Sequence, residues 1–395
     1  MLNFGETLRG ARERAGLTQA ELGQLIGYSR TAVSRMESSS DPRLTPRVLS
    51  RISEVLHTTT AALLAEEDRE DPVNRRQLLQ AAAGVAIIGA TSQVEPGRVG
   101  EQDVAEIERG IEDLRLLDQR NGGDRLGFFA RRLINDAERL LRGRFGSAMA
   151  TRLHAVQGEA SVLAGWLAQD AGDITGAARL YSDVMAAAHL ANDPLLAAHA
   201  CANLAFVTTK AGQPSRAVQC AQAGQRAAVQ GRGGPRLRAL LVAREASGHA
   251  RVGDGAAATE AIHRAWKAFD SQGGNDPSWV MFLSDVELAG ILGDVHSRLG
   301  QHNLAVEHLS RAAQMEGRPR NATSWRLGLA QGYIAAGDPG QAAALGSIVL
   351  PEVLELSSTR IRASVLELSQ SLTPHSKVFE VKAFQDKARA AGLAA

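Results

Sequence analysis

A glycine recurs through most of this 395-residue chain in a pattern that few architectures accommodate. Each of five glycines precedes an alanine by five residues and follows another small residue by seven, and successive glycines are 40, 41, 47 and 37 residues apart. Apolar residues at helical spacing flank every glycine. The pattern predicts pairs of helices that meet at a glycine turn and pack closely through small side chains. The glycines are Gly172, Gly212, Gly253, Gly300 and Gly337, the alanines are Ala177, Ala217, Ala258, Ala305 and Ala342, and the small residues are Gly165, Ala205, Ala246, Gly293 and Ala330.

The pattern small–x6–Gly–x4–Ala resembles the tetratricopeptide repeat, although it departs from the 34-residue period of that family and lacks most of its consensus aromatic residues. The resemblance implies a solenoid of helical hairpins, in which each unit buries its apolar face by stacking on its neighbours. We expect residues 102–145 to add an irregular leading pair of helices and residues 351–391 a trailing pair. The stretch LRLLDQRNGGDRLG at 114–127 is predicted to be a loop.

Helical repeats curve, so one helix of each pair lines a concave groove. The tetratricopeptide resemblance implies that a set of aromatic, amide and charged side chains faces this groove and binds an effector. An asparagine suits a peptide backbone, because its amide offers both a donor and an acceptor. The two aromatic candidates fit packing between repeats equally well. The candidates are Trp166, Gln169, His199, Asn203, Phe206, Lys210, Arg244, Ser247, Arg251, Asp294, Arg298 and Gln331.

Near the N-terminus, residues 17–37 read LTQAELGQLIGYSRTAVSRME and predict two short helices joined by a tight turn. Thr18 and Glu21 have the spacing of a capping box at the start of the first helix. Gly27 permits the turn, and Ser29 caps the second helix. The first helix is expected to bury Ala20, Leu22, Leu25 and Ile26, and the second Val33 and Met36. This is the pattern of a helix-turn-helix, which places its second helix in the DNA major groove.

The spacing of Gln19, Ala20, Gly27, Ser29, Val33 and Glu37 resembles the Xre family of phage-repressor-like regulators, over about residues 3–64. The resemblance implies a preceding helix over residues 4–14 and a following one over 44–56. It also implies roles in DNA binding. Gln19 matches a phosphate-binding position, and Ser29 lies at the start of the recognition helix, where an anion is favoured. Base readers and nearby polar positions are Arg30, Thr31, Ser34 and Arg35, and backbone clamps are Arg43 and Arg47.

The charge balance predicts that DNA binding needs two copies of the chain. The net charge is only +1, and the first 60 residues carry eight arginines and six acidic residues, or +2. A DNA-binding face must therefore arise from the placement of the cations more than from their excess. A homodimer on a palindromic double-stranded operator is expected, because a single copy would bind weakly.

A segment between the two patterns imitates a signal sequence. The run NRRQLLQAAAGVAIIGA at residues 74–90 places twin arginines before an apolar stretch, but it follows the predicted helix-turn-helix. Its apolar part, Leu78–Ala90, is thirteen residues long and falls short of the ~20 residues that span a membrane. We therefore expect a connecting helix, no membrane association and a cytoplasmic protein. Xre-type regulators of actinobacterial type carry a similar insert, which extends the resemblance.

These patterns predict an all-α protein with a helix-turn-helix domain at 1–65, a linker at 66–101 and tetratricopeptide-like repeats at 102–395. The combination resembles peptide-responsive quorum-sensing regulators, and it implies a transcriptional regulator whose repeats bind a peptide. The alternative is an adaptor that recruits a protein partner to DNA. No P-loop, metal-spaced His/Cys cluster or nucleophile motif occurs, so we expect no enzyme activity, cofactor or metal. Cys201 and Cys220 are expected to be free thiols.

Overall fold

We describe a computed structural model of the chain, which places residues 4–38, 48, 51–52, 55–56, 97–121, 123–124, 126–316 and 319–393. The predicted connecting helix at 74–90 and the predicted clamps Arg43 and Arg47 lie outside the described residues. The chain divides into two compact units, residues 1–93 and 94–395, which are described separately.

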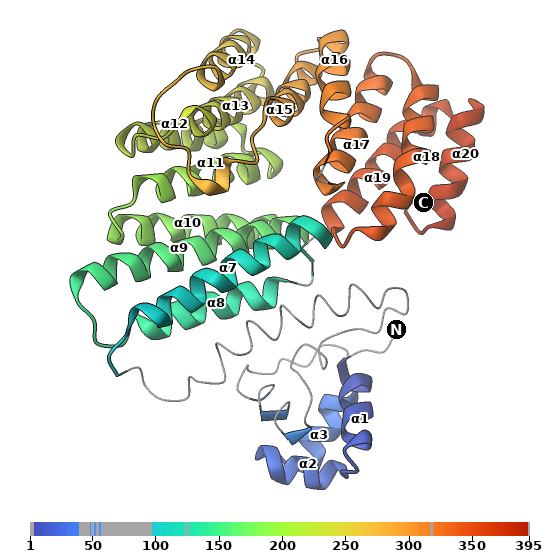
Figure 1. The fold of residues 1–395 in the computed structure, drawn as a ribbon. Helices are drawn as coiled ribbons and strands as arrows, with labels where there is room; N and C mark the ends of the chain where they lie inside the picture. The colour runs from blue at the N-terminus through green and yellow to red at the C-terminus, as the bar shows by residue number, and fades with distance from the viewer. Residues whose placement is uncertain are drawn as a thin grey trace. The chain divides into compact units, whose positions relative to one another are not determined.

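The N-terminal unit begins with three short helices, α1 (Phe4–Arg14), α2 (Gln19–Ile26) and α3 (Arg30–Ser38) (Figure 1). Their shared core contains the fully buried Leu8, Leu22 and Val33. The capping box between Thr18 and Glu21 is present, and Gly27 has the left-handed φ of 78° that the turn requires. These features confirm the predicted helix-turn-helix.

Two details of the predicted core of α2 are wrong. Ala20 and Leu25 are exposed, whereas Gly23 is buried. Gly23 packs so closely on the turn that an added Cβ would lie 2.6 Å from the carbonyl oxygen of Tyr28. Fewer positions of α2 are buried than its apolar residues suggest. The helix is only eight residues long, and the following turn packs against its Gly23 side.

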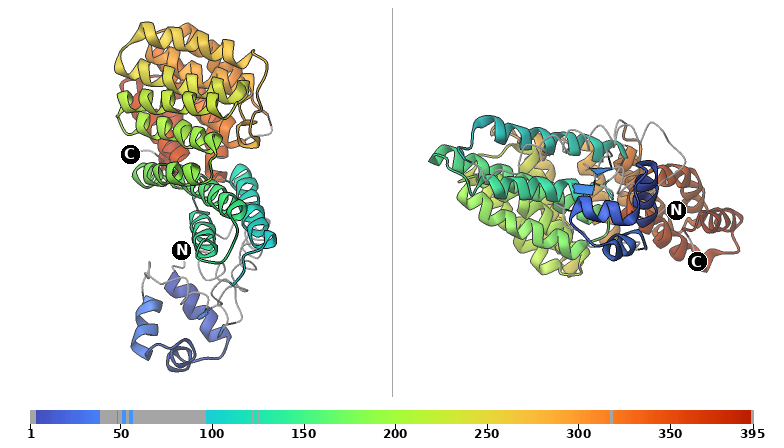
Figure 2. Two further views of the ribbon diagram at one scale, coloured as in Figure 1. Left: turned by 90° about the vertical axis from the view of Figure 1, so that its left-hand side faces the viewer. Right: turned by 90° about the horizontal axis from the view of Figure 1, so that it is seen from below.

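The C-terminal unit is a stack of paired helices (Figures 1 and 2). Two single-turn 3₁₀ helices, η1 (Ser278–Val280) and η2 (Thr373–His375), lie in the connections. The described residues form no β-strand, only two isolated bridges, which confirms the all-α fold. The α-helices are α7 (Glu101–Asn121), α8 (Gly127–Leu140), α9 (Ser147–Asp170), α10 (Ile174–Leu190), α11 (Pro194–Lys210), α12 (Pro214–Gln230), α13 (Pro235–Val252), α14 (Gly255–Phe269), α15 (Asp285–Arg298), α16 (His302–Ala313), α17 (Pro319–Ala335), α18 (Pro339–Glu355), α19 (Thr359–Leu372) and α20 (Phe379–Ala390).

The glycine and alanine pattern has the predicted structural meaning. All five repeat glycines lie in turns between paired helices with φ between 72° and 89°, a region that strongly favours glycine. All five alanines are fully buried. At the preceding small positions, a Cβ on Gly165 would lie 2.6 Å from the ring of Tyr181. The helical-hairpin solenoid is therefore confirmed.

The predicted loop at 114–127 is wrong, because α7 continues as a helix to Asn121. Ile107, Ile111, Leu114 and Leu117 are buried at helical spacing and extend the apolar stripe past the predicted boundary. Asp118, which lies on this last turn, is also buried. Of the described residues in the predicted loop, 123–124 and 126 follow the end of α7 and are not helical.

The two ends of the helical stack meet. α17 contacts α7, and α19 contacts α9, although these helices are far apart in the sequence (Figure 1). We call the four buried or half-buried charged residues at this junction, Asp118, Asp170, Arg320 and Arg360, the seam. Arg320 donates two hydrogen bonds to Asp118, one of them 2.9 Å from Nη2 to Oδ2. Arg360 Nε lies 3.1 Å from Asp170 Oδ1.

Neighbouring polar groups complete the seam. The indole N–H of Trp166 donates to Asp118 at 2.9 Å, and the Arg320 guanidinium lies over the indole ring, 5.2 Å from its centroid. Thr359 donates from both its backbone N–H and its hydroxyl to Asp124. The carboxylates of the seam therefore have several partners each, which is the condition under which buried charges are tolerated.

Burial lowers the pKa of Arg320, but the charges of Asp118 and Asp170 more than offset this effect, so that its pKa lies above the ordinary value. The guanidinium remains charged, and its loss would leave the buried side chain of Asp118 without a charged partner, while Asp170 would keep Arg360.

We predict that Arg320→Met lowers the free energy of unfolding by about 3–5 kcal/mol, the typical cost of removing one partner of a buried ion pair. Urea denaturation followed by tryptophan fluorescence measures the loss, because all four tryptophans lie between residues 166 and 325. Arg311→Met is the matched control, since Arg311 pairs with Asp285 while both side chains are about half exposed. The control should lose less than about 1 kcal/mol. Equal losses in the two variants would contradict the importance of the seam.

Candidate functional site

The exposed face of α3 carries the predicted DNA-reading side chains. Arg30, Thr31 and Arg35 are exposed, and Ser34 is half-buried. Among the described residues, neither Arg30 nor Arg35 has a hydrogen-bond or ion-pair partner. The Ser29 hydroxyl accepts a hydrogen bond from the backbone N–H of Ala32 at 3.2 Å and caps the helix. Two unpaired guanidinium groups on a capped, exposed helix are suited to reading base edges.

The opposite face of α3 is held by the buried carboxylate of Glu37. Arg12 donates to both of its oxygens at 2.6 and 3.2 Å, and Gln19 Nε2 donates at 2.9 Å. Arg9 Nε lies 3.5 Å from the same carboxylate. The Gln19 amide thus uses one N–H inside the protein, and its second N–H is the donor left for the predicted phosphate contact. This network ties α1 and α2 to α3.

Burial alone would raise the pKa of the Glu37 carboxyl, but hydrogen bonds from Arg12 and Gln19 outweigh it, and the pKa lies below its ordinary value. A lowered folded-state pKa means that Glu37 stabilises the unit fully above its unfolded-state pKa of about 4.3. This contribution is lost as the pH falls through the lower, folded-state pKa.

We predict that Glu37→Gln destabilises the N-terminal unit by about 3 kcal/mol at neutral pH, because it leaves Arg12 buried without its charge partner. The difference from wild type should shrink at a pH below the folded-state pKa, where Glu37 itself is protonated. Hydrogen exchange of peptides covering residues 19–38 reports on this unit separately from the repeats. Glu21→Gln is the control, since Glu21 is exposed and only completes the capping box. A difference that persists unchanged in acid would refute this account.

In the repeat unit, several predicted groove residues converge on the ring of Phe206 on α11. The Arg244 guanidinium on α13 lies over the ring at 4.5 Å from its centroid, and the Lys210 ammonium lies at 5.9 Å. Phe206 also packs against the buried cluster that includes Tyr181. Phe206 is therefore a packing residue, which is one of its two expected roles, and its ring also lies beneath two cations.

Further cations lie nearby with a single acidic partner. Asp294 on α15 is 3.6 Å from Arg251 and 3.4 Å from Arg298. Its charge also acts on Lys210 and Arg244. Burial lowers the pKa of Arg244 to about 10, in spite of attraction by Glu287, Tyr181 and Asp294. Lys210, Arg244, Arg251 and Arg298 therefore all lie within electrostatic range of the carboxylate of Asp294.

Two buried polar side chains of this region have no hydrogen-bond partner. Gln169 on α9 is fully buried, and neither its amide nitrogen nor its amide oxygen is bonded. Tyr181 on α10 is also fully buried, and its hydroxyl is unpaired. Unsatisfied buried polar groups cost free energy, so their retention points to a ligand or to ordered water. Sequence reasoning missed Tyr181, which lies on the other helix of its pair.

Three other candidates have partners within the repeats. His199 is buried and stacks on Trp279 with parallel rings 3.6 Å apart. Its backbone carbonyl accepts a hydrogen bond from Asn203 at 3.1 Å. Ser247 is buried and donates to the carbonyl of Ala243, so it is a helix-packing residue rather than a groove contact.

Trp279 comes from the long connection between α14 and α15, which accounts for the longest repeat spacing. Asp276 in this connection accepts hydrogen bonds from the backbone N–H groups of Arg236 and Leu237 at the start of α13. Arg236 Nε in turn donates to the carbonyl of Leu283. These hydrogen bonds hold the connection against α13, and Trp279 in the connection stacks on His199 of α11.

The last two candidates differ in their surroundings. Trp166 contacts the seam, because its indole N–H donates a hydrogen bond to Asp118. Gln331 on α17 is half-buried and has no hydrogen-bond partner among the described residues.

Cys201 and Cys220 are both free thiols, as expected.

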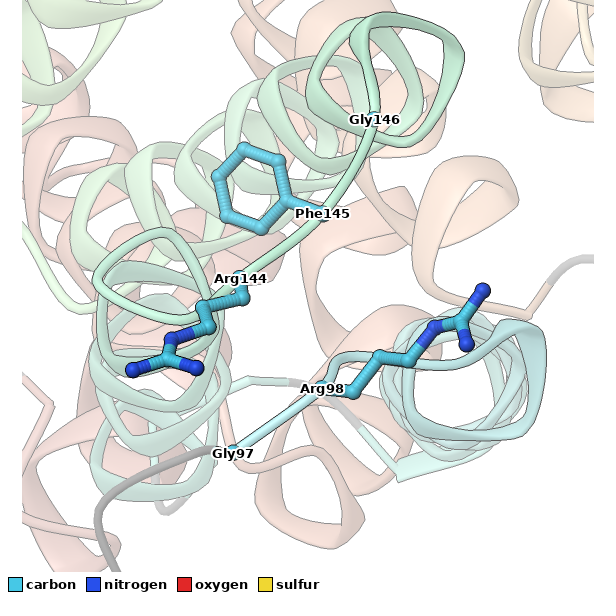
Figure 3. Close-up of a pocket in the computed structure, with 5 residues that line it drawn as sticks. All are labelled: Gly97, Arg98, Arg144, Phe145 and Gly146. Atoms are coloured by element: carbon cyan, nitrogen blue, oxygen red, sulfur yellow. The ribbon is translucent and has the colours of Figure 1, made fainter.

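A separate pocket of about 440 Å³ lies where residue 97 enters the repeat unit, lined by Gly97, Arg98, Arg144, Phe145 and Gly146 (Figure 3). Arg98 and Arg144 are joined by a parallel bridge between their backbones. Their guanidinium groups point away from each other in Figure 3, so they do not converge on one ligand.

A family model described as a helix-turn-helix domain matches residues 3–66. The N-terminal unit is therefore a helix-turn-helix domain, a type of domain that binds DNA. No curated protein sequence matches the chain.

Solved structures match the chain with low TM-scores. A Rap protein in complex with competence and sporulation factor is 12% identical, with a TM-score of 0.42 and coverage of 96% of this chain and 97% of that one. PlcR of Bacillus thuringiensis with the peptide PapR7 and DNA is 12% identical, with a TM-score of 0.27 and coverage of 68% and 95%. BtubC of P. vanneervenii is 18% identical, with a TM-score of 0.35 and coverage of 74% and 92%. The fold assignment rests on the helices described above.

Among the residues that the structure describes, no helix is both long enough and apolar enough to cross a membrane.

Proposed function

We propose that this protein is a sequence-specific DNA-binding transcriptional regulator, and that its repeat unit binds a peptide effector that modulates DNA binding. The exposed and unpaired Arg30 and Arg35 on α3, within a matched helix-turn-helix domain, support the DNA-binding half of the proposal. The unpartnered polar groups of Gln169, Tyr181 and Arg244 support the effector half. Residues 1–65, 66–101 and 102–395 are the proposed head, linker and sensor.

The proposed regulator acts as a homodimer. One recognition helix contacts only a short stretch of the major groove, and two-fold pairing of two heads extends the recognised site. A palindromic operator with half-sites one helical turn of about 10 bp, or a multiple of it, apart is the geometric consequence.

We predict that Arg30→Ala and Arg35→Ala each weaken binding to the preferred duplex by about 1–3 kcal/mol and relax base preference. Selection of random duplexes on the full-length protein finds the preferred site, and fluorescence anisotropy at fixed salt gives the affinities. Arg226→Ala, on the exposed face of α12, is the control and should bind DNA as wild type does. If selection yields no preferred duplex, or both head variants bind like wild type, α3 is not the recognition helix.

Coupling between the two units is tested on the same full-length protein. Peptides from the culture medium of the source organism should shift DNA affinity by 5- to 150-fold, the usual size of allosteric coupling. Asn203→Ala should weaken this shift without altering DNA affinity in the absence of peptide, because Asn203 is a proposed effector contact and its amide oxygen accepts no hydrogen bond from a described residue. Binding of a folded protein in place of any peptide would favour the adaptor alternative.

A further inference from the structure

The two cysteines of the chain lie on facing helices of one hairpin. Cys201 on α11 is buried, and Cys220 on α12 is half-buried. A Cβ added at Gly224 of α12 would lie 2.9 Å from the Cβ of Cys201, so Cys201 packs directly on this part of α12. Cys220 precedes Gly224 by four residues and lies on the same face of the helix, one turn away. The packing of the hairpin thus brings the two thiols to the same place.

A thioether of the preceding hairpin adds a third sulfur atom. The Sδ of Met185 on α10 lies 4.0 Å from the Sγ of Cys201. Cys220 packs against the apolar cluster that α10 and α11 share. A negative charge on Cys220 raises the pKa of the Cys201 thiol, which places the two thiols within electrostatic range of each other. We call Met185, Cys201 and Cys220 the sulfur cluster.

The spacing in the sulfur cluster suits a soft metal ion. Sulfur ligands bind such an ion at about 2.3 Å, and two of them in a trigonal arrangement are about 4 Å apart. The sulfur atoms of Met185 and Cys201 already have this separation. Thiolate and thioether ligands favour Cu(I) over harder divalent ions. Among the described residues, no group of three histidine, cysteine or carboxylate side chains could hold a metal, so the ligand set of a structural zinc site is not available here.

The surroundings of the thiols favour a cation over oxidation. Burial raises the pKa of Cys201 to about 11 and raises the pKa of Cys220 above its ordinary value. Both thiols are therefore protonated at neutral pH, and a protonated thiol is a poor nucleophile. A metal ion replaces the thiol protons and supplies the positive charge that a buried thiolate lacks. The charge of Arg226, which lowers the pKa of Cys201, opposes the single negative charge of one Cu(I) held by two thiolates.

We propose that the sulfur cluster is a binding site for one Cu(I) ion. Cys201 and Cys220 bind the ion as thiolates, each releasing its thiol proton to solvent, and Met185 binds it as a neutral thioether. The copper remains Cu(I), so no electron is transferred. Met185 is 39% exposed, which leaves the ion a route from solvent. The bound ion links α10 to the following hairpin of α11 and α12, across the boundary between two repeats.

The test uses reduced full-length protein without oxygen, with Cu(I) supplied as its bicinchoninate complex. Wild type should take one Cu(I) per chain from this complex, and X-ray absorption at the copper edge should show three sulfur neighbours at about 2.3 Å. Because two thiol protons leave, the affinity should rise by about 100-fold per pH unit below the pKa of both thiols. Failure to take up copper, or nitrogen and oxygen neighbours in place of sulfur, would overturn the site.

Cys220→Ser and Met185→Leu should each weaken Cu(I) binding by at least about tenfold, since even a group that only supports a metal ligand contributes about 10- to 100-fold. Both side chains are partly exposed, so these variants change the site without emptying the core. Met281→Leu is the matched control, because Met281 is an exposed thioether on the connection between α14 and α15.

Thermal unfolding gives a second readout. Cu(I) should raise the unfolding temperature of wild type and of Met281→Leu by a similar amount, and it should raise that of the two cluster variants less. Unfolding without copper checks that the variants fold. An unchanged affinity in Met185→Leu would contradict the three-sulfur site, and an unchanged affinity in Cys220→Ser would contradict a site made by both thiols.

Discussion

The buried contact of Arg320 with Asp118 and Asp170 turns an open row of helices into a closed arrangement. A helical repeat array is held by contacts between neighbours, and nothing in the repeat pattern requires its ends to meet. Here they meet through carboxylates that are almost completely buried, a costly placement that only closely fitted opposite charges offset. The contacts of α7 with α17 and of α9 with α19 therefore add to the local stacking of neighbouring helices.

Two fully buried polar side chains near the seam have no hydrogen-bond partner. Gln169 and Asp170 are adjacent on α9, and the second is fixed by Arg360 while the first has no partner. Because the seam holds α9 in place, the Gln169 amide cannot reach a partner by a small shift of its helix. Packing of Tyr181 under Gly165 restricts the hydroxyl in the same way. Gln169 and Tyr181 therefore have unpaired polar groups although both side chains are fully buried.

The sequence predicted the fold where a conformational requirement of the backbone recurs at regular spacing. Glycines at positive φ and fully buried alanines recur at visible spacing, so the hairpins and their turns were predictable. The capping box of α2 and the exposed face of α3 follow from equally local rules. The narrower core of α2 was not predictable, since it depends on how closely the turn at Tyr28 returns to Gly23. The partners of the groove candidates were also hidden, because Trp279 reaches His199 from a long connection without a repeat pattern. The seam could not be predicted from local sequence patterns, since Asp118 and Arg320 are 202 residues apart. Asp118 also lies in a stretch that was predicted to be a loop.

Closure of the array has a consequence for the order of folding. Contacts within and between adjacent hairpins join residues that are close in the chain, and they form quickly with little loss of loop entropy. The contact of α7 with α17 closes a loop of about two hundred residues. The entropy cost of closing this loop falls once the intervening hairpins have folded and shortened the disordered chain between the ends. The seam should therefore be nearly absent from the transition state for folding and should act chiefly by slowing the opening of the finished structure. The ends of the array should therefore join last and separate first, so the seam rather than any single repeat should set the lifetime of the closed arrangement.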